Sequence, residues 1–206
     1  MGATDIVFYI VILIMSVVIH EISHGFVAEK FGDKTARFAG RLTLNPLRHL
    51  DLFGSVLLPA LLVISNTGII FGWAKPVPYN PDNLSNKRWG TLAVAAAGIL
   101  ANLFIATLFG LVLRFTAASN FSEGFYFMTS AIVLVNIALA VFNLLPIPPL
   151  DGSKILFSFL PSSWAPVLAF LEQYSFFLIV VFIIFFPGSL YPIMAYLFQL
   201  ITGLPI

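Results

Sequence analysis

Long hydrophobic stretches separated by short polar segments dominate the chain. Apolar residues fill six of these stretches: Ile6–Ala28, Leu52–Trp73, Thr91–Leu113, Phe125–Pro146, Pro166–Phe186 and Leu190–Ile201. A helix needs ~20 mostly apolar residues to cross a bilayer. The pattern therefore predicts an all-α polytopic membrane protein with about five to six transmembrane helices, folded as a single domain over residues 1–206.

The composition supports a membrane protein. Of the 206 residues, 60% are hydrophobic and only 9% are charged, whereas about a quarter of the residues in a soluble domain are charged. Soluble enzymes, nucleic-acid-binding proteins and disordered chains are therefore excluded. The chain has no cysteine, which excludes disulfide bonds and thiolate metal sites. The first stretch follows Asp5 instead of a basic segment and has no small-residue cleavage site, so we expect it to be retained as a membrane helix.

The positive charges predict how the chain crosses the membrane. Five of the ten Lys and Arg residues lie between Lys30 and Arg48, and three more lie between Lys75 and Arg88. The positive-inside rule puts both loops in the cytoplasm and the N-terminus outside. The stretch Leu52–Trp73 would then begin and end on one side. Pro59 and the polar residues 65–68 favour such a re-entrant or hairpin segment. The alternative is a plain span with the second loop outside.

Ionisable residues interrupt the first apolar stretch in the order His20-Glu21-Ile22-Ser23-His24. Ionisable groups are costly at membrane depth, so they indicate function by default. Residues i and i+4 share a helix face, so His20 and His24 can both bind one Zn²⁺. Glu21 is placed to act as a general base, as in zinc metalloproteases. The alternative is a pair of histidines that line a pore or a proton relay, which would not need this spacing.

A catalytic zinc site usually has a third protein ligand. The third histidine of the metzincin pattern is absent, because Val27 and Lys30 occupy the matching positions. His49 lies beside Arg48 in the basic loop, where a plain loop role is more plausible. Asp151 stands out because it follows three prolines at membrane depth and approaches the cytoplasmic end of its segment, as His20 and His24 do. Its alternative role is that of a helix cap before Gly152.

These motifs together resemble the site-2 protease family of intramembrane zinc metalloproteases, in particular the short bacterial and archaeal members without a PDZ domain. The resemblance covers most of residues 10–156. It rests on the His20–His24 motif and on four further segments: Leu44–Pro46, Gly72–Pro78, Ala97–Asn102 and Asn143–Gly152. One departure is Ile99, where family members commonly have the proline of Gly-Pro-x-x-Asn.

The resemblance implies specific roles for individual residues. His20, His24 and Asp151 would bind one zinc ion per chain, Glu21 would be the catalytic base, and the amide of Asn143 would support the substrate or the oxyanion. It also implies short strands at Arg41–Leu44 and Pro76–Tyr79. The catalytic core would cover about residues 6–156, and residues 164–203 would form a peripheral helix pair.

The expected function is hydrolysis of a peptide bond within or next to the transmembrane segment of a single-span membrane protein. The enzyme would lie in the lipid bilayer, in a prokaryotic cell membrane, with its active site toward the cytoplasm and without a nucleic-acid partner. A zinc- or proton-coupled transporter would also use intramembrane His, Glu and Asp residues, but it would favour internal repeats, which this chain lacks. A binding protein without activity would be expected to lose Glu21, and a membrane-tethered protease acting on soluble segments would carry its motif outside the apolar stretch. The sequence does not indicate an oligomeric state.

Overall fold

The computed structural model describes residues 3–65, 72–116 and 122–205, and within these residues every regular element is helical. The α-helices are α1 (Ala3–Lys30), α2 (Thr35–Phe38), α3 (Leu58–Ile64), α4 (Lys87–Phe115), α5 (Glu123–Asn143), α6 (Asp151–Phe159), α7 (Ala165–Gln173), α8 (Ser175–Phe185) and α9 (Tyr191–Thr202). A π-helix, Leu52–Leu57, leads into α3, and 3-10 turns cover Pro46–Arg48, Pro81–Asn83 and Ser162–Trp164. The prediction of an all-α membrane protein is confirmed for the described residues.

Three helices, α1, α4 and α5, are long and apolar enough to cross a membrane. A fourth candidate is the pair α7 and α8, which is bent by 69° between Gln173 and Ser175. Helix α9 has only 12 residues, or ~18 Å of helix, which is shorter than a bilayer core of ~30 Å. The described part therefore contains three to four candidate spans. This is fewer than the five to six expected from hydropathy, because hydropathy does not register where a helix bends or ends.

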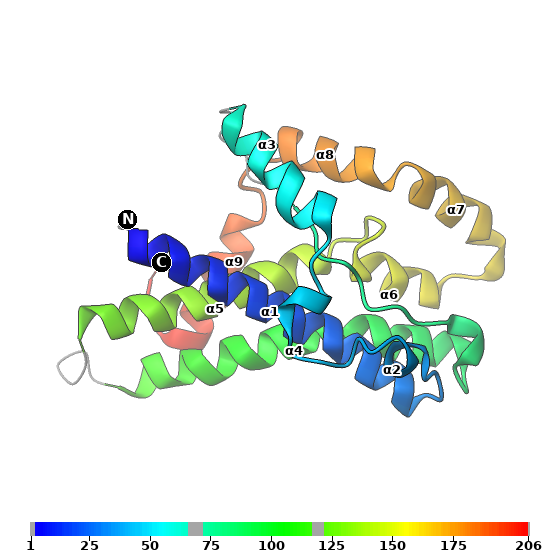
Figure 1. The fold of residues 1–206 in the computed structure, drawn as a ribbon, viewed down its shortest axis with the longest axis horizontal. Coiled ribbons are helices and arrows are strands. Elements are labelled where there is room, and N and C mark those ends of the chain that lie inside the picture. Colours follow the sequence, from blue (N-terminus) through cyan, green and yellow to red (C-terminus); the bar gives the residue numbers. More distant parts are fainter. Residues whose placement is uncertain (1–2, 66–71, 117–121, 206) are drawn as a thin grey trace.

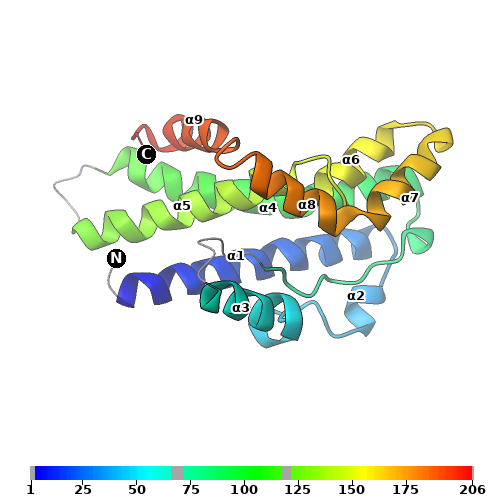
Figure 2. The same ribbon diagram turned by 90° about the horizontal axis from the view of Figure 1, so that it is seen from above.

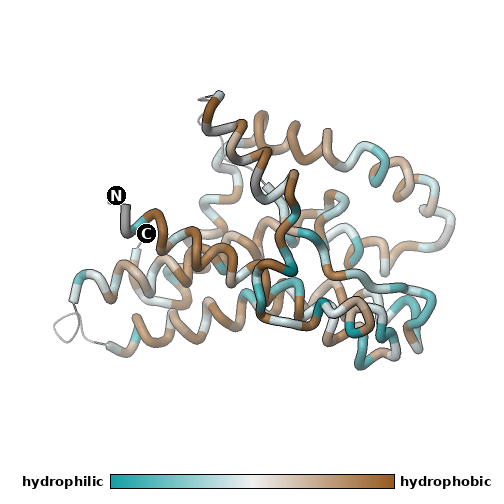
Figure 3. Tube along the Cα trace, in the orientation of Figure 1, coloured by the Kyte–Doolittle hydropathy of each residue, from teal (hydrophilic) through white to brown (hydrophobic). Residues whose placement is uncertain are grey.

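Helices α4, α5 and α9 share a core of buried apolar side chains. Its members are Ala106, Leu113, Val133, Ile137, Val141 and Phe198. Gly110 of α4 faces α9, where an added Cβ would lie 2.4 Å from Cγ2 of Ile201. A small residue at this position lets the two helices approach closely, as is common where membrane helices pack. Figure 3 shows apolar residues along α1, α5 and α8, in keeping with surfaces that face lipid.

The two basic loops lie together at one end of the helix bundle. Helix α1 ends there and α4 begins there, while the N-terminus of α1 and the start of α5 lie at the opposite end (Figures 1 and 2). The backbone N–H of Ser85 donates to the carbonyl of Phe31 at 2.7 Å and so ties the two loops together. Hydrophilic residues gather at this end (Figure 3). The structure thus agrees with the prediction that both loops face one side. Residues 117–121 of the loop expected on the other side lie outside the described residues.

The two ends of the stretch from Leu52 to Trp73 lie next to each other. The N–H of Trp73 donates to the carbonyl of Gly54 at 3.1 Å, and the N–H of Lys75 donates to the carbonyl of His49 at 2.8 Å. The hydroxyl of Ser55 also donates to the carbonyl of Trp73. The two ends therefore lie side by side, as the hairpin interpretation requires. Residues 66–71 fall outside the described part.

The short strands implied by the family resemblance are not formed. Residues 41–44 and 74–80 are irregular, with no strand pairing in either segment. Pro76 and Pro78 have no backbone N–H, so one edge of this segment cannot donate hydrogen bonds to a neighbouring strand. The intervening N–H of Val77 instead donates to the carboxylate of Glu21, and that of Asn80 donates to Asp33. The segment is held by side chains and not by a neighbouring strand.

Candidate metal centre

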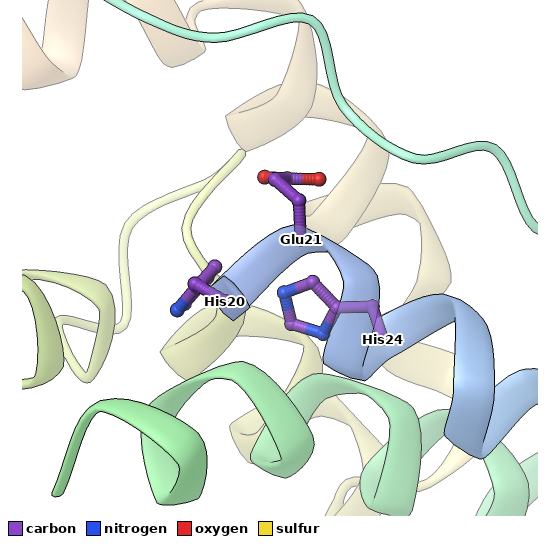
Figure 4. A group of neighbouring side chains, drawn as sticks. All are labelled: His20, Glu21 and His24. Carbon is purple, nitrogen blue, oxygen red and sulfur yellow. The ribbon is translucent and has the colours of Figure 1, made fainter. Parts of the chain in front are cut away.

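Helix α1 brings His20, Glu21 and His24 together. One ligand atom from each of these residues lies within 4.8 Å of the other two. The imidazole rings are 4.7 Å apart between centroids and nearly perpendicular. Both histidines are buried, and Figure 4 shows the three side chains projecting from a single continuous stretch of the helix. The predicted use of the helical i and i+4 spacing is thus realised in the structure.

Asp151 reaches the same place from a distant part of the chain. It is the first residue of α6, after the proline-containing turn that follows α5. Its Oδ2 lies 3.1 Å from Nε2 of His20 and 3.2 Å from Nε2 of His24. The neighbouring Gly152 is packed so tightly that an added Cβ would lie 2.1 Å from the carbonyl oxygen of Leu144. The absence of a side chain there lets the first turn of α6 lie against the end of α5, which positions Asp151.

The arrangement of these three side chains fits a zinc ion. Oδ2 of Asp151 is buried and forms no hydrogen bond of acceptable geometry, although two ring nitrogens lie within 3.2 Å of it. Three acceptor atoms, one carboxylate oxygen and two ring nitrogens, thus lie close together without hydrogen bonds between them, as they would around a shared cation. The separations of 3.1 and 3.2 Å are close to the ~3.3 Å edge of a tetrahedron whose metal–ligand bonds are ~2.0–2.1 Å long. Two imidazole nitrogens and one carboxylate oxygen form a donor set typical of catalytic zinc.

Buried polar side chains from three helices orient His20. Its Nδ1 lies 2.6 Å from Oδ1 of Asn102 on α4. The amide nitrogen of Asn102 donates to Oδ1 of Asn136 on α5 at 2.8 Å, so its oxygen is left to accept from the ring. The amide nitrogen of Asn136 donates in turn to Oγ of Ser16 on α1 at 3.0 Å. His20 therefore carries its proton on Nδ1 and directs the lone pair of Nε2 toward Asp151 and the metal position.

Simpler contacts orient the other two side chains, His24 and Asp151. Nδ1 of His24 lies 2.7 Å from the carbonyl oxygen of Val94. A carbonyl can only accept a hydrogen bond, so His24 also carries its proton on Nδ1 and leaves Nε2 free. On Asp151, Oδ1 accepts from the ammonium group of Lys154 at 3.3 Å. That contact leaves Oδ2 turned toward the two histidines.

The Glu21 carboxylate is partly exposed and has a partner of its own. Its Oε2 accepts a hydrogen bond from the backbone N–H of Val77 at 2.8 Å. This bond ties the expected catalytic base to the irregular segment that closes the hairpin. Glu21 thus lies beside the candidate metal position, and Asp151 is available there as a third donor. Its exposure leaves room for a water molecule to approach.

Gly98 provides space for the His20 ring. A Cβ placed on Gly98 would lie 2.5 Å from Cε1 and 2.7 Å from both ring nitrogens of His20. Gly98 and Asn102 are one turn apart on α4, so they contact the same ring from the same helix face. The family-like residues of this helix, noted in the sequence as Gly98 and Asn102, therefore have a direct role at the site. Ile99, the departure from the family pattern, is buried elsewhere in the core.

Asn143 and His49 were also considered from the sequence as parts of the site, and in the structure both form hydrogen bonds with backbone carbonyl groups. The Asn143 amide donates to the carbonyl of Leu139 in its own helix at 2.9 Å, so its support of a substrate stays a prediction. His49 is buried in its loop, with Nε2 2.9 Å from the carbonyl oxygen of Thr43.

Sequence reasoning missed Ser16 and Asn136. Asn136 is a polar residue inside an apolar helix, and that alone could have marked it as functional.

Comparison with known proteins agrees with this geometry. The family model described as "Peptidase family M50" matches residues 8–133 and 116–186. The chain belongs to peptidase family M50. It is 38% identical over 185 residues to "Putative zinc metalloprotease YwhC" of Bacillus subtilis, covering 87% of this chain and 80% of that protein. It is also 36% identical over 174 residues to "Putative zinc metalloprotease Rip2" of Mycolicibacterium smegmatis, covering 83% of this chain and 64% of that protein. No solved structure matches.

Membership of family M50, the site-2 protease family, decides between the alternatives left open by the sequence. The chain is a zinc metalloprotease of this family and an integral membrane protein, and its His20, Glu21 and His24 group carries the family's metalloprotease motif. The transporter interpretation therefore has no support. The predicted family and the predicted type of enzyme are confirmed.

Proposed function

We propose that this M50 peptidase is an intramembrane zinc endopeptidase. It hydrolyses a peptide bond within or next to the transmembrane segment of a single-span membrane protein, in a prokaryotic cell membrane. The observation that carries this proposal is the position of the site. His20 and His24 lie ten and six residues before the end of a 26-residue apolar span, Asp5–Lys30. A site within such a span can be reached by a substrate that lies in the bilayer.

The ligands of the proposed zinc ion are His20, His24 and Asp151, with one ion per chain. A bound zinc ion supplies a Lewis acid, which polarises a carbonyl group and makes a water molecule acidic near neutral pH. Glu21 accepts the proton of the attacking water and later delivers it to the leaving amine. The Asn102 and Val94 contacts keep the histidine Nε2 atoms available. Asn143 is proposed to support the substrate backbone, which requires its side chain to leave its present bond to Leu139.

The substrate must expose a peptide bond that a helix would protect. A transmembrane helix buries each carbonyl in its own hydrogen-bonded ladder, so local unwinding has to precede attack. Glycine or proline near the cleaved bond would lower the cost of this unwinding. We infer that the active site is toward the cytoplasm. His20 and His24 lie nearer the end of α1 than its start, both basic loops lie at that end of the bundle (Figure 1), and charge bias puts the loops inside.

The direct test uses the full chain and a single-span reporter substrate, co-reconstituted in lipid vesicles. Glu21→Gln is expected to keep one zinc ion per chain and to abolish cleavage, because it removes the base and leaves the three ligands. The paired variant His20→Ala with Asp151→Ala is expected to lose zinc. Glu29→Gln, on the same helix but away from the site, is the matched control and should keep both properties. Cleavage by Glu21→Gln would contradict the proposed role of Glu21, and full zinc in the paired variant would contradict the ligand set.

A further inference from the structure

A pocket separate from the metal centre lies where the two basic loops meet. It has a volume of about 470 Å³, which is within the range of small-molecule sites. Three cationic side chains line it, together with apolar side chains; the main lining residues are Arg41, Arg48, Lys75, Leu47, Leu50 and Pro78. No carboxylate is among the lining residues. The pocket therefore has the charge of a site for an anion.

Arg41 is the buried member of this group. Its residue surface is 8% exposed, which is rare for a charged side chain without a partner of opposite charge. One guanidinium nitrogen, Nη2, donates to the carbonyl of Lys75 at 2.7 Å, but its buried Nε has no hydrogen-bond partner. In the described part of the chain, none of Arg41, Arg48 and Lys75 forms an ion pair with a carboxylate. A buried and unsatisfied guanidinium donor in a cationic pocket calls for an anionic acceptor.

The apolar lining restricts the kind of anion. Leu47 is 73% exposed and Leu50 is 38% exposed, so the pocket presents accessible apolar side chains as well as cations. A small inorganic ion has no apolar surface to bury against these leucine side chains. An amphiphile with a phosphate group and an acyl chain would contact both kinds of residue, as lipid does where basic residues meet the membrane surface.

The pocket also adjoins the segment that holds the catalytic base. Lys75 and Pro78 line it, and Val77 between them donates its N–H to Glu21. We propose that this pocket binds a phosphate diester of the kind carried by an anionic phospholipid headgroup. Arg41, Arg48 and Lys75 contact the phosphate, while Leu47 and Leu50 contact the apolar part of the lipid.

The test measures how many lipid molecules the full chain retains in native mass spectrometry after release from nanodiscs. One arm uses phosphatidylcholine alone, a second adds phosphatidylglycerol, and a third uses phosphatidylcholine with soluble glycerophosphoglycerol, which is the phosphate diester of phosphatidylglycerol without its acyl chains. The variant carries Arg48→Gln and Lys75→Gln, which leave the buried Arg41 in place. The matched control carries Lys30→Gln and Lys34→Gln, which remove the same charge from exposed positions in the same loop. Zinc content verifies that each variant is folded.

We expect wild type and control to retain phosphatidylglycerol in preference to phosphatidylcholine. Removal of one pocket cation should weaken the retention of phosphatidylglycerol about fivefold, and removal of two cations in the double variant should weaken it about 25-fold. Binding of glycerophosphoglycerol in neutral discs, lost in the double variant, would support the phosphate-diester chemistry with a soluble source. Equal retention of phosphatidylglycerol by the double variant and the control, with no binding of glycerophosphoglycerol, would overturn the proposal.

Discussion

Oδ1 of Asn102 lies 2.6 Å from Nδ1 of His20, although 82 positions separate the two residues in the chain. The contact joins α4 to α1 inside the membrane-spanning bundle. It settles which ring nitrogen of His20 carries the proton, because the Asn102 amide nitrogen is already engaged with Asn136. Asn102 thus orients the His20 ring, and through it would act on the proposed zinc site.

Asn102→Ala is expected to weaken zinc binding by about 10- to 100-fold, since the hydrogen-bond partners of metal-bound histidines typically have effects of this size. Competition with a zinc chelator on the purified protein measures the change. Asn143→Ala is the comparison, because its amide bonds only to its own helix in the structure. That variant should keep its zinc affinity and lose cleavage activity. Similar zinc loss in both variants would argue against a specific role for Asn102.

Gly98→Ala is expected to displace the His20 ring. The added methyl group would lie within 2.5 Å of the ring carbon Cε1, so either the ring or the helix must move. Zinc content and cleavage should fall together, with the other helices intact by circular dichroism. Gly124→Ala is the control, since its added Cβ would approach no atom closer than 3.9 Å. Wild-type zinc content in Gly98→Ala would mean that the site adapts without loss.

Asp33→Asn is expected to destabilise the protein. The buried Asp33 carboxylate accepts hydrogen bonds from Thr35, from the N–H of Asn80 and from the side chain of Asn83. An amide cannot accept at both oxygen positions, and lost hydrogen bonds to a buried charged group cost about 2 kcal/mol. Thermal unfolding in detergent measures the change. Asp82→Asn, at an exposed position, should leave the unfolding temperature nearly unchanged.

The hydrogen bonds of the Asp33 carboxylate also predict that the stability of the protein depends on pH. Burial by itself would raise the pKa of Asp33, but the hydrogen bonds from Thr35, Asn83 and Asn80 outweigh burial and lower this pKa below its ordinary value. A lowered folded pKa means that the stabilisation is complete above the unfolded pKa and is lost as pH falls through the folded pKa. The stability difference between wild type and Asp33→Asn should therefore shrink below about pH 4. A constant difference down to pH ~2 would contradict this account.

Membrane topology can be tested with single cysteines in this cysteine-free chain. Lys34→Cys and Asp82→Cys lie in the two basic loops at exposed positions, and Glu123→Cys lies at the opposite end of the bundle. An impermeant thiol reagent on intact cells should label only Glu123→Cys, and all three variants should react after lysis. Asp33, although in the same loop, is unsuited as a probe because it is fully buried. Labelling of Asp82→Cys on intact cells would make residues 52–73 a true span.

The features that the sequence predicted well are those that depend on local spacing or on order along the chain. One helical turn separates His20 from His24, so their common face follows from helix geometry alone. Asp151 could be singled out because few carboxylates exist and only one follows a proline-rich break, and the structure places it beside both histidines; its role as a metal ligand stays a prediction. The carbonyl of Val94 could not be predicted, because a backbone atom has no signal in the sequence. The prediction of short strands at residues 41–44 and 76–79 was wrong. In the second segment Pro76 and Pro78 leave one edge without donors, and on the other edge the N–H of Val77 donates to Glu21.

The contacts among Ser16, Asn102 and Asn136 have a consequence for how the three long helices find their rotational register. Lipid tails solvate leucine as well as another helix does, so apolar faces alone specify the rotation of a membrane helix only weakly. Polar groups that must find one another inside hydrocarbon do specify it. An alanine inserted in α1 between Ser16 and His20 would turn these two residues ~100° relative to each other. The helix could then satisfy Asn136 or present His20 to Asn102, but not both, so the rotation that keeps its polar contacts is also the one that places His20 at the proposed metal site.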